Sequence, residues 1–333
     1  MNPLLTINTA YKVPERTLSL APMMDYTDRH DRFLLRLITK NMWLFTEMIT
    51  SNTLLNADPA RFLKYDQSEH PVVIQLGGSS PKDLAICAKM AEQAGYDEVN
   101  LNVGCPSDRV QSGCFGASLM ATPEIVAECV TAMQSAVSIP VSVKCRIGID
   151  NDDYNDLKNF INVVSGSGCE VFYIHARKAW LQGLSPKENR DVPPLVYDSV
   201  YRIKAEFPLL TIAINGGIKS IQDCKQHLAH VDGCMIGREA YANPYMLASV
   251  DRELYGAQDA IPSRHEVLLQ YIDYIENEMA NGTRLTQMSR HVLGLFQGVS
   301  GAKAWRRHIS ENAHKKGSNA QLLVEAEKFI REN

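Results

Sequence analysis

The sequence has no apolar run that approaches the ~18–20 uninterrupted apolar residues of a membrane span. Its first segment, Met1–Arg16, mixes Asn, Thr, Lys and Glu and lacks the apolar run of a signal peptide. The cysteines include no C-x-x-C pair, and no histidines cluster at metal-ligand spacing. These absences predict a cytoplasmic protein without a membrane span or a metal site.

The eight cysteines lie at positions 87, 105, 114, 129, 145, 169, 224 and 234. Most of them lie inside apolar strand or helix patterns, such as Cys145 in VSVKCRIG and Cys234 in DGCMIG. This pattern is typical of small core residues. Cys105 differs, because it lies between Gly104 and Pro106 at the end of an apolar run.

The charge of the chain is unevenly distributed. The net charge is −4, which by itself argues against binding to a nucleic acid. Residues 260–333, however, hold 10 Lys and Arg against 8 Asp and Glu. Within 284–316 there is one acidic residue, Glu311, and there are seven basic ones: Arg284, Arg290, Lys303, Arg306, Arg307, Lys315 and Lys316. This segment is compatible with a surface that binds a polyanion, although solvated basic helix faces are also common.

Eight short apolar runs alternate with helical patterns along the first 240 residues. Several of them, such as PVVIQLG, are continuous rather than alternating, as in strands that are buried on both faces of a parallel sheet. Ser80-Pro81 and Thr122-Pro123 each begin a helix pattern with a cap residue and a proline. The strand candidates are Leu18–Met23, Leu44–Met48, Val72–Leu76, Glu98–Val103, Val141–Arg146, Val171–His175, Leu210–Asn215 and Gly233–Gly237.

This repetition predicts an α/β fold, a (β/α)8 TIM barrel, over residues 1–255. No G-x-G-x-x-G follows the first strand candidate, so a Rossmann fold lacks its fingerprint. After Gly256–Pro262, a linker candidate, only helix patterns occur, and residues 256–333 are predicted to form a small all-helical domain. Its helix candidates are Ser263–Asn281, Thr286–Phe296, Gly301–Asn312 and Asn319–Asn333. No exposed heptad or apolar stripe suggests an oligomer, so we expect a monomer.

In a TIM barrel the active site lies at the carboxyl ends of the strands. Asn215-Gly216-Gly217 and Gly237-Arg238 follow the last two strand candidates, where many barrels bind phosphate through loop N–H groups. Tight turns are the alternative explanation for these glycines. Lys144 and Arg146 occupy a strand pattern in which the inward position should be apolar, and a lysine inside a barrel needs a partner. A flavin edge that becomes anionic on reduction would suit this lysine, and so would a structural salt bridge.

Cys105 has two possible roles, catalytic or structural. A nucleophilic cysteine needs a nearby base to lower its pKa from about 8.5. No base is adjacent in the sequence, although His175 could approach in space. A general acid needs instead a thiol that keeps its proton near neutral pH.

The chain resembles the tRNA-dihydrouridine synthases in six motifs that occur in order at the expected strand ends. Two stretches, DYTDRH and ARKAWLQGLSPKENR (176–190), resemble the bacterial subfamily that acts on D-loop uridines at tRNA positions 20 and 20a. The six motifs are LAPMMDYTDRHDR (20–32), LNVGCPSDRVQSGCFGASLM (101–120), VKCRIG (143–148), IHARKAW (174–180), INGGI (214–218) and GREAY (237–241).

The resemblance implies that NADPH reduces a tightly bound FMN, whose N5 passes a hydride to C6 of the uracil ring, while Cys105 donates a proton to C5. It implies that Asn102 lies beside the flipped base and that Lys187, Arg190, Lys303 and Arg306 contact tRNA. It also implies an FMN site formed by Pro22, Met23, Met24, Gln75, Lys144, His175, Asn215, Gly216, Gly217, Gly237 and Arg238.

Three other functions remain open at this point. An FMN barrel that acts on a free pyrimidine, as dihydroorotate dehydrogenases do, would share the fold but leave the basic helical region unexplained. A tRNA-binding protein without redox chemistry would bind no flavin. A phosphate-sugar isomerase barrel would need neither flavin nor the cysteine.

Overall fold

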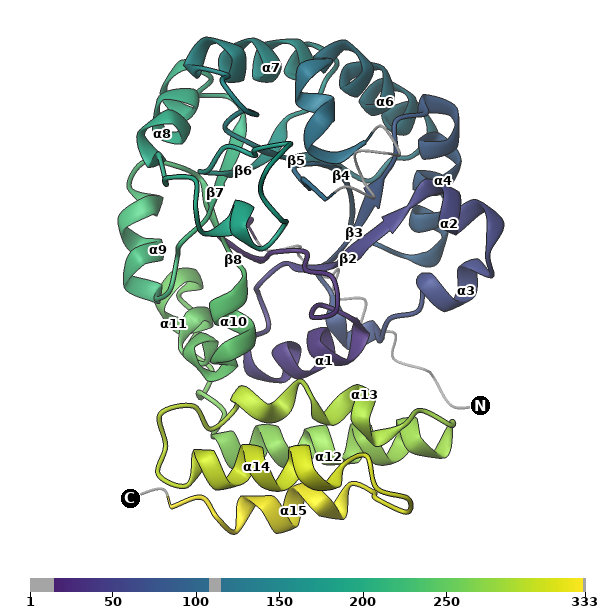
Figure 1. Cartoon of the computed structure of the whole chain (residues 1–333), viewed down its shortest axis with the longest axis vertical. Helices are drawn as coiled ribbons and strands as arrows, with labels where there is room; N and C mark the ends of the chain where they lie inside the picture. The colour runs from purple at the N-terminus through teal and green to yellow at the C-terminus, as the bar shows by residue number, and fades with distance from the viewer. Residues whose placement is uncertain (1–14, 108–114, 332–333) are drawn as a thin grey trace, which may run out of the picture.

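The computed structural model describes residues 15–107 and 115–331. Its eight strands pair in parallel in the order β1-β8-β7-β6-β5-β4-β3-β2. Each strand is followed by helical structure, which confirms the predicted (β/α)8 fold (Figure 1). The strands are β1 Leu18–Leu20, β2 Leu44–Thr50, β3 Val72–Gly77, β4 Glu98–Val103, β5 Val141–Arg146, β6 Val171–His175, β7 Thr211–Asn215 and β8 Gly233–Ile236.

The contact between the first two strands closes the barrel. Ser19 bridges Trp43 in parallel. The N–H of Leu20 donates to the Trp43 carbonyl at 2.8 Å, and the N–H of Trp43 donates to the Leu18 carbonyl at 3.0 Å. The backbone groups of β1 are therefore paired on both sides, as a closed barrel requires.

Helices surround the barrel in Figure 1 and bury an apolar face against the outside of the strands. The predicted helix starts at Pro81 and Pro123 are both correct, and Ser80 caps the first of them by accepting from the Asp83 N–H. Thr122 forms no side-chain cap. The α-helices are α1 Arg29–Ile38, α2 Ser51–Asn56, α3 Pro59–Phe62, α4 Pro81–Ala94, α6 Pro123–Ala136, α7 Tyr154–Gly166, α8 Tyr197–Glu206, α9 Ile221–Leu228, α10 Arg238–Ala242 and α11 Val250–Tyr255, and the 3-10 turns are η1 Gln67–Glu69, η2 Gly116–Ala121, η3 Glu188–Arg190 and η4 Pro244–Leu247.

Strand ends differ from the predictions by one to three residues. β1 ends at Leu20, not at Met23, because the Met23 carbonyl accepts from the N–H groups of Tyr26 and Thr27 and so begins a turn. β7 begins at Thr211 instead of Leu210, and β8 ends at Ile236.

After α11, the chain forms a separate layer of helices below the barrel in Figure 1: α12 Arg264–Ala280, α13 Leu285–Ser289, η5 Val292–Gly294, α14 Ala302–Asn312 and α15 Gln321–Glu327. The predicted single helix Thr286–Phe296 is wrong. It is divided into α13 and η5, where Gly294 lies so close to Ala242 that a Cβ would be 2.6 Å from the Ala242 carbonyl oxygen. The last helix ends before residue 333, since Arg331 donates its N–H to the Ser300 carbonyl.

The cysteine prediction is confirmed for the part of the chain that the structure describes. Six cysteines are buried there, and Cys105 is half-buried; Cys114 lies outside the described residues. Within the same residues, no group of His, Cys, Asp and Glu could hold a metal ion. No helix of the described segments is long and apolar enough to cross a membrane.

Candidate active site

Polar side chains gather inside the barrel toward the carboxyl ends of β3 to β7. In the register of the sheet, Asn102 lies beside Lys144, Arg146 beside His175, and His175 beside Asn215. Connections that follow β1 and β6 lie across this end of the barrel in Figure 1. The prediction that polar groups converge on one barrel mouth is therefore confirmed for these residues.

Cys105 lies at this mouth on a short loop that two side chains hold in position. The Asn102 carboxamide oxygen accepts the N–H groups of Gly104 and Cys105, both at 3.0 Å. Arg146 Nε donates to the Gly104 carbonyl at 2.9 Å. The Cys105 thiol lies 3.5 Å from the Ser107 hydroxyl. No described hydrogen bond or ion pair joins Cys105 to His175, so the structure gives this thiol no activating base.

Asn102 is also bound to the predicted flavin residue Gln75. Asn102 Nδ2 donates to Gln75 Oε1 at 2.7 Å, and both side chains are almost fully buried. The structure thus links a predicted base contact, a predicted cofactor contact and the cysteine loop through two side-chain amides.

Lys144 lies at the mouth without a carboxylate partner among the residues described. Its Nζ donates to Asn215 Oδ1 at 3.2 Å, and the Asn215 amide donates in turn to the Met235 carbonyl at 2.8 Å. Burial and the neighbouring Arg146 charge lower the pKa of Lys144 to about 8. A structural salt bridge, the alternative considered for this lysine, is not formed.

Arg146, the second cation on β5, has a structural role. Its guanidinium donates to the carbonyls of Gly104, Lys178 and Asn189, each at 2.9 Å. Burial lowers its pKa to about 10. The bonds join the Cys105 loop to the connection after β6, since a guanidinium carries several donors in a fixed fork.

The surroundings of His175 favour its neutral form. Burial and the charges of Arg146 and Lys144 lower its pKa well below the usual value. Its Nδ1 is buried and has no hydrogen-bond partner among the described residues. Because a buried polar atom without a partner is costly, this nitrogen is a natural contact for a ligand.

The glycines after β7 are required by both conformation and space. Gly216 has φ +116° and Gly217 has φ +72°, the left-handed region that favours glycine. A Cβ on Gly216 would lie 2.9 Å from Leu195, and one on Gly217 would lie 2.6 Å from the same side chain. The two glycines therefore allow a turn at the mouth that a residue with a side chain could not adopt.

The backbone N–H groups of Gly216, Gly217, Gly237 and Arg238 donate to no carbonyl within the described ranges. Such amides suit an anionic group like phosphate. The guanidinium of Arg238 is paired with both carboxylate oxygens of Asp191, at 2.7 and 3.2 Å, and this pair is exposed. The backbone N–H of Arg238 is therefore available at the mouth, while its guanidinium is bound to Asp191.

The predicted residues Pro22, Met23 and Met24 follow β1 at the same end of the barrel. The Met23 sulfur would lie 3.5 Å from a Cβ on Gly237, so this segment adjoins the loop after β8. Met24 is 56% exposed.

These features fit a flavin mononucleotide. The backbone N–H groups of the glycine loops after β7 and β8 could bind its phosphate. Lys144, which has no carboxylate partner among the described residues, could bind an electron-rich edge of its ring. Unpartnered His175 Nδ1 and exposed Met24 add a polar and an apolar contact.

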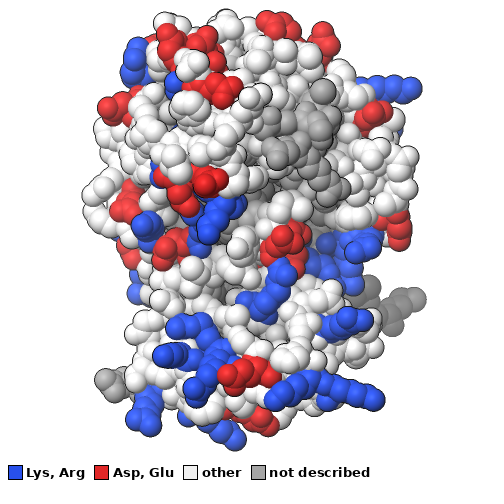
Figure 2. Space-filling model, in the orientation of Figure 1, with Lys and Arg blue, Asp and Glu red and all other residues white. Residues whose placement is uncertain are grey.

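The four predicted tRNA contacts lie in two places. Lys187 and Arg190 are exposed beside η3 on the connection after β6. Lys303 and Arg306 lie on α14, where Lys303 is exposed and Arg306 donates to Gln297 at 3.0 Å. Figure 2 shows basic side chains gathered over the C-terminal helices and at their boundary with the barrel.

Two features of the mouth could not be found from the sequence patterns. Arg177 has a buried Nε without a partner among described residues and contributes to the lowered pKa of His175. Its only signal was its place two residues after His175. Tyr197 donates to the Gly216 carbonyl at 2.9 Å from a distant helix, and nothing in the sequence indicated this contact.

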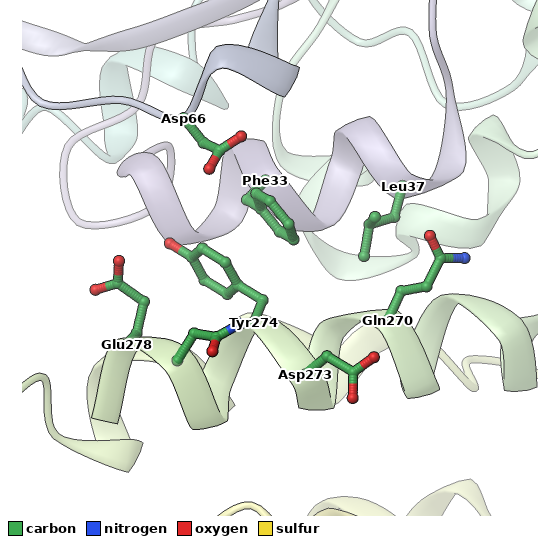
Figure 3. Close-up of a pocket in the computed structure, with 8 residues that line it drawn as sticks. Phe33, Leu37, Asp66, Gln270, Asp273, Tyr274 and Glu278 are labelled. Carbon is green, nitrogen blue, oxygen red and sulfur yellow. The ribbon is translucent and has the colours of Figure 1, made fainter. Parts of the chain in front are cut away.

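A separate cleft of about 380 Å³ lies between α1 and α12 (Figure 3). Phe33 and Tyr274 form its apolar floor, and Asp66, Asp273 and Glu278 lie around it. It contains none of the predicted site residues, so we do not assign it to the barrel chemistry.

Comparison with known proteins agrees with the geometry of the mouth. Residues 19–332 match the family described as "Dihydrouridine synthase (Dus)". The chain is 60% identical over 311 residues to the tRNA-dihydrouridine(20/20a) synthase of Vibrio vulnificus, covering 93% of this chain and 95% of that one. It is 55% identical over 333 residues to the enzyme of the same name from Escherichia coli K12, covering 97% and 96%. The chain therefore belongs to the dihydrouridine synthase family.

Proposed function

We propose that this chain is an FMN-dependent, NADPH-using enzyme that reduces uridine to 5,6-dihydrouridine at positions 20 and 20a of tRNA. The names of its relatives support the substrate and the positions. The observation that supports a bound flavin is a set of groups at the mouth beside Cys105 whose partners are missing among the described residues. Lys144 has no carboxylate partner, His175 Nδ1 has no hydrogen-bond partner, and the N–H groups of the loops after β7 and β8 donate to no carbonyl. A tRNA substrate agrees with the cytoplasmic location and monomeric state expected from the sequence.

The proposed FMN site consists of the residues at the carboxyl ends of six strands. Gly216, Gly217, Gly237 and Arg238 would bind the phosphate through backbone N–H groups. Lys144, His175, Gln75 and Asn215 would bind the polar edge of the ring, and Pro22, Met23 and Met24 would cover its apolar part. When bound and reduced by NADPH, the flavin supplies a hydride for C6 of the uracil ring.

Cys105 is the proposed proton donor to C5. Hydride addition at C6 makes C5 basic, because the C5–C6 double bond is conjugated with a carbonyl, and a positioned acid is then needed. The thiol has only the Ser107 hydroxyl as a described partner. Arg146 donates to the Gly104 carbonyl at 2.9 Å, so a cation adjoins the loop that carries the proposed donor.

The proposal requires the uridine to leave its stack. A base inside folded tRNA cannot reach the mouth while stacked, so it must be flipped out, with Asn102 beside it. Lys187 and Arg190 on the barrel and Lys303 and Arg306 on α14 would hold the RNA backbone on either side. Such contacts with phosphate make binding sensitive to salt.

The proposal is tested with purified protein, NADPH and a tRNA transcript that carries no modifications. We expect a yellow protein with a flavin spectrum and dihydrouridine at positions 20 and 20a, detected by position-resolved mass spectrometry. Free uridine should turn over negligibly. Equal rates on free uridine and tRNA would favour a free-pyrimidine enzyme, and a colourless protein that FMN cannot reconstitute would favour a binding protein.

A further inference from the structure

A continuous chain of hydrogen bonds between side chains runs inside the barrel from the amino ends of the strands to the Cys105 loop. It consists of the side chains of Arg16, Glu98, Ser142, Asn100, Gln75 and Asn102, here called the interior ladder. From this geometry we infer that Glu98, Ser142 and Asn100, three residues far from the mouth, are positioning residues for Cys105. The kinetic part of this inference rests on the proposed function; the structural part does not.

The lower end of the interior ladder is a buried carboxylate. Glu98 is 0% exposed, and Arg16 donates to its Oε2 through Nε at 2.8 Å and Nη2 at 2.7 Å. Its other oxygen accepts from the Ser142 hydroxyl at 2.5 Å. A carboxylate can only accept, so the hydrogen of Ser142 must point toward Glu98.

The direction of this hydrogen bond fixes the orientation of each following side chain in the ladder. Since its hydrogen is used, the Ser142 oxygen accepts from Asn100 Nδ2 at 2.8 Å. The oxygen of Asn100 therefore points the other way and accepts from Gln75 Nε2 at 2.8 Å. Gln75 Oε1 then accepts from Asn102 Nδ2 at 2.7 Å.

The upper end of the ladder binds the cysteine loop. With its nitrogen turned toward Gln75, Asn102 must present its oxygen to the N–H groups of Gly104 and Cys105. If every amide were reversed, Asn102 would present N–H groups to N–H groups, and the loop would lose both bonds. A row of amides alone could adopt either direction, but the Glu98 carboxylate permits only one.

Burial makes the direction costly to reverse. Ser142 and Asn100 are 0% exposed and Gln75 is 1% exposed, so solvent cannot replace a lost bond in the barrel interior. The position of the Cys105 thiol is therefore fixed by a charge at the opposite end of the barrel.

The first test interrupts the ladder with Ser142→Ala and uses Ser19→Ala as the matched control. Ser19 is an equally buried barrel serine, but its hydroxyl donates to the Cys234 carbonyl at 3.2 Å, outside the ladder. We measure the iodoacetamide alkylation rate of Cys105 in the full-length protein by peptide-resolved mass spectrometry, without RNA. Ser142→Ala should raise this rate several-fold, because the loop opens more often, and Ser19→Ala should leave it unchanged. Equal rates in the two variants would overturn the inference.

The second test removes the fixed direction of the ladder without removing a group. In Glu98→Gln, the amide must turn its nitrogen either to Ser142, which frees the serine hydrogen and leaves the direction of the ladder unfixed, or to Arg16, where two donors meet. Adding Arg16→Met removes that conflict and should return the alkylation rate of Cys105 toward the wild-type value. A double variant that alkylates as fast as Glu98→Gln would contradict the role assigned to the carboxylate.

Kinetics separate positioning from general stability. Ser142→Ala and Glu98→Gln should lower kcat for tRNA by about 10- to 100-fold, since small misplacement of a reacting group has effects of that size. The KM for tRNA should stay unchanged, because Ser142 and Glu98 are fully buried and do not face the RNA. If the protein reduces no tRNA at all, the proposed function fails, while the alkylation results still decide the ladder.

Discussion

Two clusters of charged and polar groups in this molecule are built differently. At the barrel mouth, Lys144 has only an amide oxygen as its partner, and His175 Nδ1 has none among the described residues. At the seam between α1 and the C-terminal helices, opposite charges meet: Arg29 pairs with Glu278, and Asp28 lies 3.1 Å from His291.

The pKa values follow this difference. At the seam, burial acts on Asp28 in the opposite direction, but the hydrogen bond and charge of His291 lower its pKa to about 2. At the mouth, burial and neighbouring positive charges lower the pKa of Lys144 to about 8. A fold that only needed stability would pair its cations, as the seam does. Lys144, which has no carboxylate partner among the described residues, favours a ligand that supplies the missing charge.

The largest expected effect is at the mouth. Cys105→Ala should lower dihydrouridine formation by about 10²- to 10⁴-fold, the usual contribution of a general acid. FMN content and NADPH oxidation should persist, because the thiol contacts only Ser107 among the described residues. Product is measured by mass spectrometry of tRNA and flavin by its visible spectrum. Product formation at the wild-type rate would remove Cys105 from the mechanism.

The next effect concerns the unpaired lysine. Lys144→Met should weaken FMN binding by about 10- to 100-fold, as expected for a hydrogen bond from a charged group. The pKa of about 8 lies below the ordinary 10.5, so the free protein loses this charge as pH rises through about 8. Wild-type FMN affinity, measured by fluorescence quenching, should therefore fall above pH 8, and that decline should be absent in Lys144→Met. A parallel decline in both proteins would assign it to another group.

A substitution at the seam should lower the stability of the fold and leave cofactor binding unchanged. Asn can still cap α1, so Asp28→Asn removes mainly the charge that faces His291. The folded pKa of about 2 lies below the ordinary 3.8, so the stabilisation is fully present above about pH 4 and is lost as pH falls through 2.

We therefore expect a loss of about 2 kcal/mol in unfolding free energy at pH 7, measured by urea denaturation. FMN affinity should not change. Asp259→Asn is the control, since its pair with Lys40 is exposed and should contribute less than about 1 kcal/mol. A loss of FMN from Asp28→Asn would show that the two clusters are coupled.

The smallest effect concerns RNA binding by α14. Lys303→Ala should weaken tRNA binding a few-fold and reduce the salt slope of log affinity by about 0.7–0.9, the contribution of one phosphate contact. Lys158→Ala on α7, at the opposite end of the molecule in Figure 1, should change neither. Affinity is measured by filter binding at several salt concentrations. Identical slopes for both variants would exclude Lys303 from the interface.

Much of the fold could be predicted because it repeats a local signal. The parallel strands are buried on both faces, so runs such as Val72–Gly77 are apolar apart from Gln75, and prolines after a cap residue mark the helix starts at 81 and 123. The helix predicted over Thr286–Phe296 failed because Gly294 packs against a carbonyl of a distant segment. Periodicity contains no information about such a contact.

The sequence by itself determined the barrel and the residues at its strand ends, since both depend on order along the chain and on residue type. It left open whether Lys144 and Arg146 face a ligand or a counter-charge, because a partner is chosen in space. Only the tertiary structure decided that Arg146 binds three carbonyls while Lys144 has no carboxylate among the described residues. Likewise, the spacing of two residues places Glu98, Asn100 and Asn102 on one face of β4, but the ladder is completed only by Ser142 and Gln75 from the neighbouring strands, which the tertiary structure supplies.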